Sequence, residues 1–380
     1  MIPNQWYAIA EVKEIKPGKP TSMRRVGENL VLWRDNAGQL VCMLDLCPHR
    51  GAALSGGKIV DGCIECPFHG FQYDREGQGK FIPANGIKAP VPQVFRAQTY
   101  TVREEHGFVW LWYGEKRESY PPLPFFDDLD DSFVYGSVAV HWRSHYTRSI
   151  ENQLDVSHLP FVHKNTIGRG NRTLVNGPYV TLENDTISVW VDNRVDDGTP
   201  PTKPTKMPMP MSPPLLIFRF PNIWQNRLGN DFRIVAAFAP IDDENSMVYV
   251  RTYQRVKRPN RLHWWTAQIT AQFNRLVLRE DQKVVETQRP KIAGLDIGER
   301  FIPGDRPIAL FLIHRRDLIE AANRGSNARQ GAEVVALADA EIDWSVADEG
   351  EIRPNLPYDL LPREGNRAVG RSRMKEPVVG

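Results

Sequence analysis

The chain has 380 residues, of which 41% are hydrophobic and 25% are charged, and its formal net charge is +2. This length suits two domains better than one, and the composition is that of an ordinary globular protein. The small net charge and the absence of a basic stripe give no reason to expect a nucleic-acid partner. No secretory signal is visible, and the longest apolar runs, such as Ile234–Ile241, are too short to cross a bilayer. We therefore expect no membrane association and a cytoplasmic, reducing location, where clustered cysteines favour metal binding over disulfides.

The chain up to about residue 115 predicts short strands separated by turns, because alternating apolar residues are interrupted by Gly, Pro, Asn and Asp. The clearest strands are "NLVLWRD", "LVCMLDL", "TYTVREE" and "FVWLWYG". The segment Gly114–Ser132 follows, and it is rich in proline and acidic residues with little periodicity. We interpret this segment as the linker between two domains.

A second domain is predicted to run to about Arg324. Two segments resemble strands, "VYGSVAVHWRSHYT" and "YVTLENDTISVWVDNRV", and "SIENQLDVSHLPFVH" begins as a helix. The longest helical pattern is "RLHWWTAQITAQFNRLVLREDQKVVETQ". Its apolar residues recur near the 3.6-residue helical period, at Leu262, Trp265, Ile269, Phe273, Val277 and Val284.

Two further segments have less defined patterns. Asp196–Pro214 is rich in proline and methionine, which predicts a mobile surface loop, with a lid over a pocket as the alternative. The tail after Arg324 combines small and charged residues with a proline-rich end. We expect it to pack extended against the body or a neighbouring subunit, or to be partly disordered.

The first cluster of candidate ligands lies in "CPHRGAALSGGKIVDGCIECPFHGFQY". Cys47 and His49 form one pair, and Cys66 and His69 form a second pair in a similar frame, with sixteen residues between the pairs. Two thiolates and two imidazoles suit either zinc or a 2Fe–2S cluster in which one iron takes both histidines. The common Cys/His zinc finger separates its cysteines from its histidines, whereas here each loop supplies one of each. This spacing favours the iron–sulfur cluster.

An alternative uses all four cysteines, Cys42, Cys47, Cys63 and Cys66, as a thiolate metal site. It leaves both matched histidines unexplained. Cys42 and Cys63 lie in predicted strands, where a free cysteine usually acts as a small buried hydrophobe.

The motif "CPHRG…CPFHGF" resembles the Rieske cluster motif. Respiratory Rieske proteins carry two further cysteines and a serine near the cluster, and the corresponding positions here resemble Ala52, Phe68 and Phe71. Fewer hydrogen bonds to the sulfurs favour the oxidised cluster. The resemblance therefore implies the low-potential type found in oxygenases and their ferredoxins.

The second cluster of candidate ligands lies in "ENQLDVSHLPFVH", with Asn152, Asp155, His158 and His163. On a regular helix two histidines five residues apart do not share a face. Pro160 lies between them, and we expect it to disturb the helix so that both imidazoles reach one metal. A non-haem Fe(II) site also needs a carboxylate.

The long helix offers two acidic candidates. Asp281 is in register with the apolar stripe, where a carboxylate is costly unless it is paired or binds a metal. Glu280 is one residue away, and periodicity alone does not choose between them. An acidic helix surface is the interpretation that fits Glu280 better.

Together, the spacing N-x-x-D-x-x-H-x4-H and the later "ED" resemble the catalytic domain of Rieske non-haem iron oxygenases, in the branch of vanillate and dicamba demethylases. The resemblance implies an α+β fold, in which a small all-β Rieske domain (residues 1–118) precedes a catalytic domain (119–324) with an antiparallel sheet around a long helix, and a C-terminal extension (325–380). It assigns Cys47, His49, Cys66 and His69 to the 2Fe–2S cluster and His158, His163 and Asp281 to a mononuclear Fe(II). Asn152 and Asp155 become catalytic candidates.

The resemblance also implies a head-to-tail homotrimer, in which the cluster of one subunit lies against the iron of the next. Asp155 would bridge them, accepting hydrogen bonds from His69 of the neighbour and from its own His158. No G-x-G-x-x-G opens a βαβ unit, so electrons are expected from a separate NAD(P)H-dependent reductase, with or without a ferredoxin.

We thus predict a terminal oxygenase component that hydroxylates or O/N-demethylates an aromatic or apolar small molecule. We expect pocket residues near Trp190, in Phe218–Trp224 and in the Pro/Met-rich loop. One alternative is a cis-dihydroxylating ring dioxygenase. The other is a Rieske electron-transfer protein with a non-catalytic second domain, which would hold two irons per chain rather than three.

Overall fold

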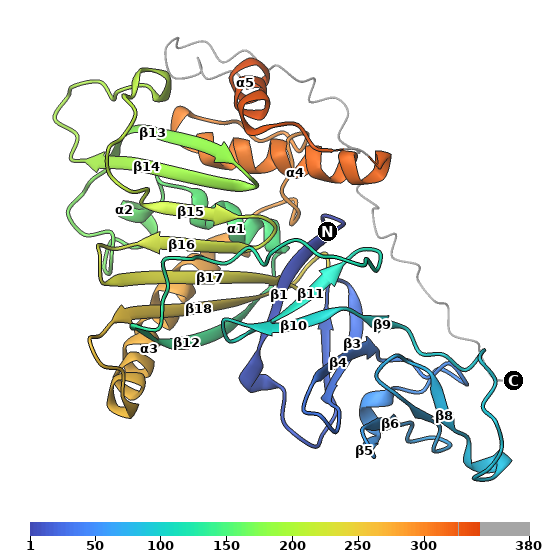
Figure 1. The fold of residues 1–380 in the computed structure, drawn as a ribbon. Coiled ribbons are helices and arrows are strands. Elements are labelled where there is room, and N and C mark those ends of the chain that lie inside the picture. Colours follow the sequence, from blue (N-terminus) through green and yellow to red (C-terminus); the bar gives the residue numbers. More distant parts are fainter. Residues whose placement is uncertain (326, 343–380) are drawn as a thin grey trace, which may run out of the picture.

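The computed structural model describes residues 1–325 and 327–342, so most of the predicted tail lies outside the described residues. Within these ranges the strands form four antiparallel sheets, and the α-helices all lie after residue 145 (Figure 1). Small β-sheets come first and a large sheet with helices follows. The predicted α+β class is confirmed.

The amino-terminal part contains two four-stranded sheets, β2-β3-β4-β9 and β5-β6-β7-β8, and the three-stranded sheet β1-β11-β10. Their strands are β1 (Gln5–Glu11), β2 (Thr21–Arg25), β3 (Glu28–Arg34), β4 (Leu40–Leu44), β5 (Lys58–Val60), β6 (Cys63–Glu65), β7 (Gln72–Tyr73), β8 (Gly79–Phe81), β9 (Thr99–Tyr100), β10 (Val102–Glu105) and β11 (Phe108–Tyr113). The four segments that the sequence predicted most clearly correspond to β3, β4, β9 with β10, and β11.

The second part is built on a seven-stranded sheet in the order β12-β18-β17-β16-β15-β14-β13. Its strands are β12 (Phe133–Trp142), β13 (Leu174–Glu183), β14 (Thr186–Arg194), β15 (Leu216–Arg219), β16 (Ile223–Arg227), β17 (Phe232–Pro240) and β18 (Ser246–Arg255). The predicted strand segment after Tyr179 forms the β13–β14 hairpin, which turns at Asn184 and Asp185, both with positive φ. Antiparallel neighbours joined by short turns account for most of the sheet.

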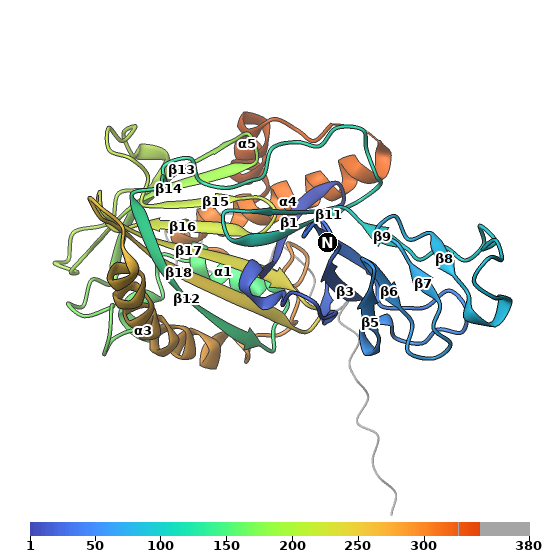
Figure 2. The ribbon, with the colours of Figure 1, turned by 60° about the horizontal axis from the view of Figure 1, so that its bottom comes forward.

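Five helices accompany this sheet within the described residues. They are α1 (Tyr146–Leu154), α2 (Leu159–Val162), α3 (Arg261–Val285), α4 (Arg306–Arg324) and α5 (Gly331–Glu341). α3 lies along β12 at the edge of the sheet (Figure 2), while α4 and α5 lie near β13 at the other edge (Figure 1). Asn260 caps α3 by accepting a hydrogen bond from the backbone N–H of His263.

The face that α3 buries is not the predicted apolar stripe. The residues it buries are Ala267, Ala271, Asn274, Leu278, Asp281 and Val285. The large side chains of Leu262, Trp265, Ile269 and Phe273 are each more than half exposed. The reason is a close approach between α3 and β12, where a Cβ on Gly136 would lie 2.1 Å from the backbone oxygen of Ala267. Only small residues fit such an approach, so the bulky ones point outward.

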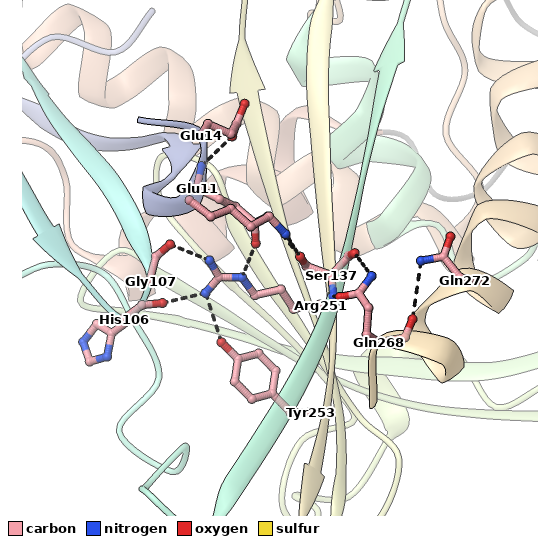
Figure 3. A network of polar contacts seen from close by, with 10 residues as sticks. Glu11, Glu14, His106, Gly107, Ser137, Arg251, Tyr253, Gln268 and Gln272 are labelled. Carbon is pink, nitrogen blue, oxygen red and sulfur yellow. Dashed lines mark hydrogen bonds and ion pairs between the residues drawn. The ribbon is translucent and has the colours of Figure 1, made fainter. Parts of the chain in front are cut away.

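A buried ionic network joins the two parts of the chain (Figure 3). Arg251 of β18 is fully buried, and its Nε donates to Glu11 Oε1 of β1 at 2.8 Å. Its other nitrogens donate to the backbone oxygens of His106 and Gly107, and its guanidinium lies over the ring of Phe108. Burial raises the pKa of Glu11, but Arg251 and Lys13 together outweigh this and the net shift is downward. β18 is therefore fixed to β1 and to the β10–β11 turn.

The predicted linker also packs against both parts. Phe125 and Phe126 are buried in a cluster with Trp6 and Tyr249, and Asp128 pairs with Arg233 of β17. At the other end, Val334 and Ala338 of α5 belong to the same hydrophobic cluster as β13. The boundaries at residues 118 and 324 stay a prediction, because core packing continues across both.

Among the described residues, no helix is both long enough and apolar enough to span a membrane.

Candidate iron–sulfur and mononuclear metal sites

The two Cys/His loops have the same backbone design. The N–H of Gly51 donates to the C=O of Cys47, and the N–H of Gly70 donates to that of Cys66. Each cysteine N–H in turn donates to the carbonyl five residues later in the chain. Both glycines have φ of +71°, a left-handed conformation that glycine adopts without strain. One loop follows β4 and the other follows β6, so two matched turns present one cysteine and one histidine each.

The side chains of these loops meet. Cys47 and Cys66 are buried, whereas His49 is half-buried and His69 is exposed, and the two imidazole centroids lie 4.8 Å apart. Phe71 stacks on His49 with ring centroids 4.5 Å apart. This arrangement suits a cluster with buried sulfurs and a more accessible histidine edge.

Tyr73 is a residue that the sequence did not single out. Its hydroxyl lies 3.2 Å from Cys47 Sγ, at a fully buried position. Burial, followed by the interaction with Cys47, raises the pKa of Tyr73, so the hydroxyl keeps its proton and would donate to the sulfur of a cluster-bound Cys47. One sulfur therefore has a hydroxyl donor despite Phe71. The only signal in the sequence is a tyrosine seven residues after Cys66.

The alternative site with four thiolates does not form. Cys42 is buried in a different hydrophobic cluster from Cys47 and Cys66. Within the described residues, the four cysteines are not among the groups of ligand atoms close enough to hold one metal ion.

The second group of ligands is positioned by a break between two helices. α1 ends at Leu154 with Asp155 as its C-cap, and His158 is the N-cap of the single-turn helix α2. His163 is the C-cap of α2, so the two histidines lie at opposite ends of one turn, with ring centroids 5.3 Å apart. Pro160 lies in the first turn of α2, where its missing N–H leaves no bond unmade. The distortion that we expected at Pro160 instead precedes His158.

α3 brings the third candidate ligand to the same point. Asp281 Oδ1 lies 2.9 Å from His163 Nε2 and 3.6 Å from His158 Nε2, and the carboxylate is buried. One ligand atom from each of these three residues lies within 4.8 Å of the others.

The three candidate ligand atoms are arranged to bind a metal cation. His163 Nδ1 lies 2.8 Å from Glu280 Oε2 and His158 Nδ1 lies 3.0 Å from the backbone oxygen of Asp155, so each imidazole donates at Nδ1. The Nε2 atom of each histidine then carries a lone pair, and both lone pairs face the carboxylate of Asp281. Apart from the two histidine Nε2 atoms, Asp281 Oδ1 has no polar partner within the described structure. Three acceptors around one point require a cation, and two His with one carboxylate suit non-haem Fe(II).

Glu280 is not the surface acid that we expected. Its Oε2 accepts hydrogen bonds from His163 Nδ1 and, at 2.7 Å, from Thr166 Oγ1. Burial raises the pKa of Glu280, but the hydrogen bonds from Thr166 and His163 outweigh it and the net shift is downward. Glu280 therefore orients the imidazole of His163. The sequence showed the "ED" pair but not which way each carboxylate points.

Asp155 and Asn152 lie beside this group. Asp155 Oδ1 accepts from the N–H of Ser157 at 2.6 Å, and its Oδ2 is 3.7 Å from His158 Nδ1, which instead bonds the backbone oxygen of Asp155. The predicted hydrogen bond from His158 to the Asp155 carboxylate is therefore not formed. Asn152 Nδ2 is buried without a partner among the described residues, at a small pocket that Asp155 and His158 also line.

A cavity of about 380 Å³ opens beside His158, His163 and Asp281. Most of its walls are apolar, from Val191, Leu215, Leu216, Ile234, Val250 and Leu278. Of the predicted pocket residues, Trp224 lines it. Trp190, Phe218 and the Asp196–Pro214 loop do not, because Trp190 bonds the backbone of Ser212 and Phe218 packs on Phe311. The residues next to Trp190 on β14, Val191 and Asn193, do line the cavity, so the prediction of a wall near Trp190 is confirmed for the strand, whereas the prediction for the loop is wrong.

Two family models match the chain in succession. Residues 5–94 match the Rieske [2Fe-2S] domain, and residues 142–310 match the vanillate O-demethylase oxygenase C-terminal domain. Together they cover about two thirds of the chain and contain all seven candidate ligands.

The functions of similar curated proteins agree with these two family matches. The vanillate O-demethylase oxygenase subunit of Pseudomonas sp. strain HR199 is 31% identical over 195 residues, which is 50% of this chain and 53% of the relative. Aminopyrrolnitrin oxygenase PrnD of Pseudomonas fluorescens is 37% identical over 42% of this chain and 45% of the relative. The alignments thus span about half the length of these relatives.

Solved structures share the fold. The QL mutant of Pseudomonas putida CBB5 NdmA, solved with caffeine, has a TM-score of 0.67 at 22% sequence identity. The match covers 88% of this chain and 94% of the NdmA chain. Dicamba monooxygenase bound to 3,6-dichlorosalicylic acid has a TM-score of 0.61 at 18% sequence identity. The match covers 90% of this chain and 96% of that protein's chain. The chain therefore belongs to the Rieske non-haem iron oxygenases, whose cofactors are a Rieske [2Fe–2S] cluster and a mononuclear iron.

Proposed function

We propose that the protein is the terminal oxygenase component of a multi-component system that hydroxylates or O/N-demethylates an aromatic or apolar small molecule. One observation carries this proposal: His158, His163 and Asp281 converge as three acceptors beside an apolar cavity. An electron carrier alone has no need of such a site. Bound Fe(II) supplies O2 activation there, with electrons from the Rieske cluster.

In this proposal Cys47 and Cys66 hold one iron of the cluster, and His49 and His69 hold the other. The buried cysteines and more accessible histidines support that division. The β5–β8 sheet lies at the far end of the molecule from α2 (Figure 1). The separation favours electron transfer between subunits, and so the head-to-tail homotrimer. Asp155 and Asn152 line a pocket beside His158, where Asn152 Nδ2 has no partner among the described residues, and both are candidates for receiving the neighbour's His69.

At the mononuclear site, Glu280 and the backbone oxygen of Asp155 fix the two imidazoles with their Nε2 atoms toward Asp281. Leu216, Ile234 and Val250 provide an apolar wall that excludes water and holds an apolar substrate close to the ligands. Electrons come from a separate NAD(P)H-dependent reductase, with or without a ferredoxin. A reducing, cytoplasmic location belongs to the same proposal, because none of the four cysteines forms a disulfide.

Product analysis tests the reaction type. The protein, NADH and a surrogate reductase are incubated with aromatic, methoxylated and N-methylated compounds, and products are identified by mass spectrometry. Loss of a methylene with formaldehyde release identifies a demethylase, and gain of one oxygen identifies a hydroxylase. Gain of two oxygens and two hydrogens would instead identify a cis-dihydroxylating enzyme. The His158→Ala variant is the control, and it should form none of these products. Product formation by this variant at the wild-type rate would refute the site.

A further inference from the structure

The outward side of α3 carries a stripe of large, exposed apolar side chains. Leu262 and Trp265 are each 63% exposed, and Ile269, Phe273 and Leu276 are 53%, 51% and 48% exposed. These five residues follow one another at steps of three or four, so they form one line that spans roughly 20 Å of helix. Single exposed apolar side chains are common on proteins, whereas a contiguous line of them marks an interaction surface.

Basic residues lie along one flank of this stripe. The exposed basic residues of α3 are Arg261, Arg275, Arg279 and Lys283. Their spacings of fourteen, four and four residues place them on one side of the helix, between the stripe and the buried face. The two carboxylates of α3 both contact His163, and neither is exposed. The outward surface of α3 is therefore apolar and cationic.

The stripe leads to the segment that borders the cavity. Glu280 lies four residues after Leu276 and continues the same side of α3, where it accepts hydrogen bonds from His163 and Thr166. α2 and the residues after it therefore lie at the end of the stripe. Their exposed apolar and basic side chains are Phe161, Lys164, Ile167, Arg169 and Arg172. The last three of these also line the cavity, so the apolar, cationic surface continues to the cavity edge.

We propose that this surface, from the α3 stripe to the segment after α2, docks reversibly on an anionic lipid bilayer. A helix with Trp, Leu and Phe on one side and Arg and Lys beside them is the type that lies in the plane of a bilayer surface. Negative headgroups complement the cations, whereas the α3 of a second copy would bring like charges together. The neighbouring subunit of the proposed trimer instead approaches a pocket lined by Val284 and Val285, at the other end of α3.

The docked orientation gives the surface a use. An apolar substrate concentrates in the bilayer, and the cavity edge at Ile167 and Arg169 would lie against it. This use rests on the proposed oxygenase function, but membrane docking itself does not. The expectation of no membrane association rested on the lack of long apolar runs, and a helix that lies in the bilayer surface needs none.

Vesicle binding without turnover tests the proposal. The iron-loaded protein is mixed with unilamellar vesicles of phosphatidylcholine, with or without about 30% phosphatidylserine, and co-sedimentation measures the bound fraction. We expect at least roughly ten-fold tighter binding to the anionic vesicles. Raising the salt concentration from about 0.1 M to about 0.5 M should remove most of this difference, because salt screens the charges.

Variants on α3 locate the surface. Arg275→Gln/Arg279→Gln should weaken binding to anionic vesicles by roughly 25-fold, about five-fold for each cation removed. Trp265→Ala should independently weaken it by roughly ten-fold, through lost apolar contact. Ile87→Ala and Lys88→Gln are matched controls at exposed positions after β8, which lies on the other side of the molecule from α3 (Figure 1). Neither control should change binding.

Sedimentation velocity without vesicles distinguishes a bilayer from a second copy as the occupant. All variants should keep the oligomeric state of the wild type, and dissociation by Trp265→Ala would mean that another copy covers the stripe and would overturn the proposal. No binding to anionic vesicles would favour an acidic protein partner and overturn it too, as would equal binding to both vesicles or equal losses in the control variants. Product formation without vesicle binding would refute this inference alone, whereas vesicle binding without oxygenation of any compound would refute the proposed function.

Discussion

Two adjacent acidic residues on α3 have different surroundings, and the difference defines the candidate metal site. Successive residues on a helix point about 100° apart. Asp281 therefore points at both imidazole Nε2 atoms, while Glu280 reaches around to His163 Nδ1. Periodicity placed a carboxylate near the core but could not assign these directions, because they depend on where α2 lies.

Replacing Glu280 tests its positioning role. Glu280→Gln removes the charge that holds the His163 N–H, and we expect iron affinity at the mononuclear site to fall by roughly 10-fold or more. Competition with a chelator, followed by iron analysis, measures this affinity. The visible spectrum of the Rieske cluster is the internal control and should not change. Unaltered iron retention in Glu280→Gln would show that Glu280 does not support His163.

The hydroxyl of Tyr73 gives a prediction for the cluster. Tyr73→Phe removes a donor to Cys47 Sγ, so the reduced cluster loses stabilisation and its potential should fall. Redox titration followed by the visible spectrum measures the shift. Tyr100→Phe is a matched control, since its hydroxyl bonds the Gln98 side chain. An equal potential in wild type and Tyr73→Phe would mean that the hydroxyl does not interact with the sulfur.

At the scale of elements, the sequence predicted α3 as a helix but not its orientation. Apolar periodicity located it because Leu262, Trp265, Ile269 and Phe273 do share one side. That side faces outward because α3 lies so close to Gly136, beside Ala267, that only small residues fit against the strand. A pattern of hydrophobic residues identifies an amphipathic helix, but the space available against a neighbouring strand decides which side is buried.

Two substitutions distinguish the faces of α3. Trp265→Lys changes an exposed side chain, and we expect the free energy of unfolding to change by no more than about 0.5 kcal/mol. Ala271→Leu overfills the contact with the sheet and should cost about 1–3 kcal/mol. Denaturant unfolding of both holo-variants measures the difference. A larger loss for Trp265→Lys than for Ala271→Leu would contradict the orientation described above.

For the whole molecule, the two parts of the chain are joined by the pair of Arg251 and Glu11. Both are buried, and each satisfies groups from the other part. Removing one partner of a buried pair leaves an uncompensated charge. The amino-terminal sheets would then be less firmly placed relative to the large sheet.

Arg251→Met should destabilise the protein by about 3–5 kcal/mol, and the double variant Arg251→Met/Glu11→Met should recover part of this loss. Because the pKa of Glu11 is lowered in the folded state, its contribution is present above its unfolded pKa of about 4.3 and is lost as the pH falls through the folded pKa. Unfolding measured at pH 7 and at acidic pH should therefore show a smaller gap between wild type and Arg251→Met in acid. A single-variant loss below about 1 kcal/mol at pH 7 would rule out this role.

The sequence predicted the two ligand groups better than it predicted the cavity. Ligand spacing is local within each loop, and the structure brings His158, His163 and Asp281 together as expected. The cavity depends on the register of several strands, so the sequence located the strand near Trp190 and the residue Trp224 but not which neighbouring side chains face the cavity. The lining residues Asn193, Asn226 and Asn274 had no local signal, because an asparagine in a strand or helix resembles any other polar residue.

Iron content tests the central claim most directly. The purified, reconstituted protein should hold about three irons per chain, two in the cluster and one at the mononuclear site. His158→Ala should hold about two, with an unchanged Rieske spectrum and no oxygenation. Two irons in the wild type, or three in His158→Ala with oxygenation retained, would contradict the assignment of His158, His163 and Asp281 as the site of a mononuclear iron.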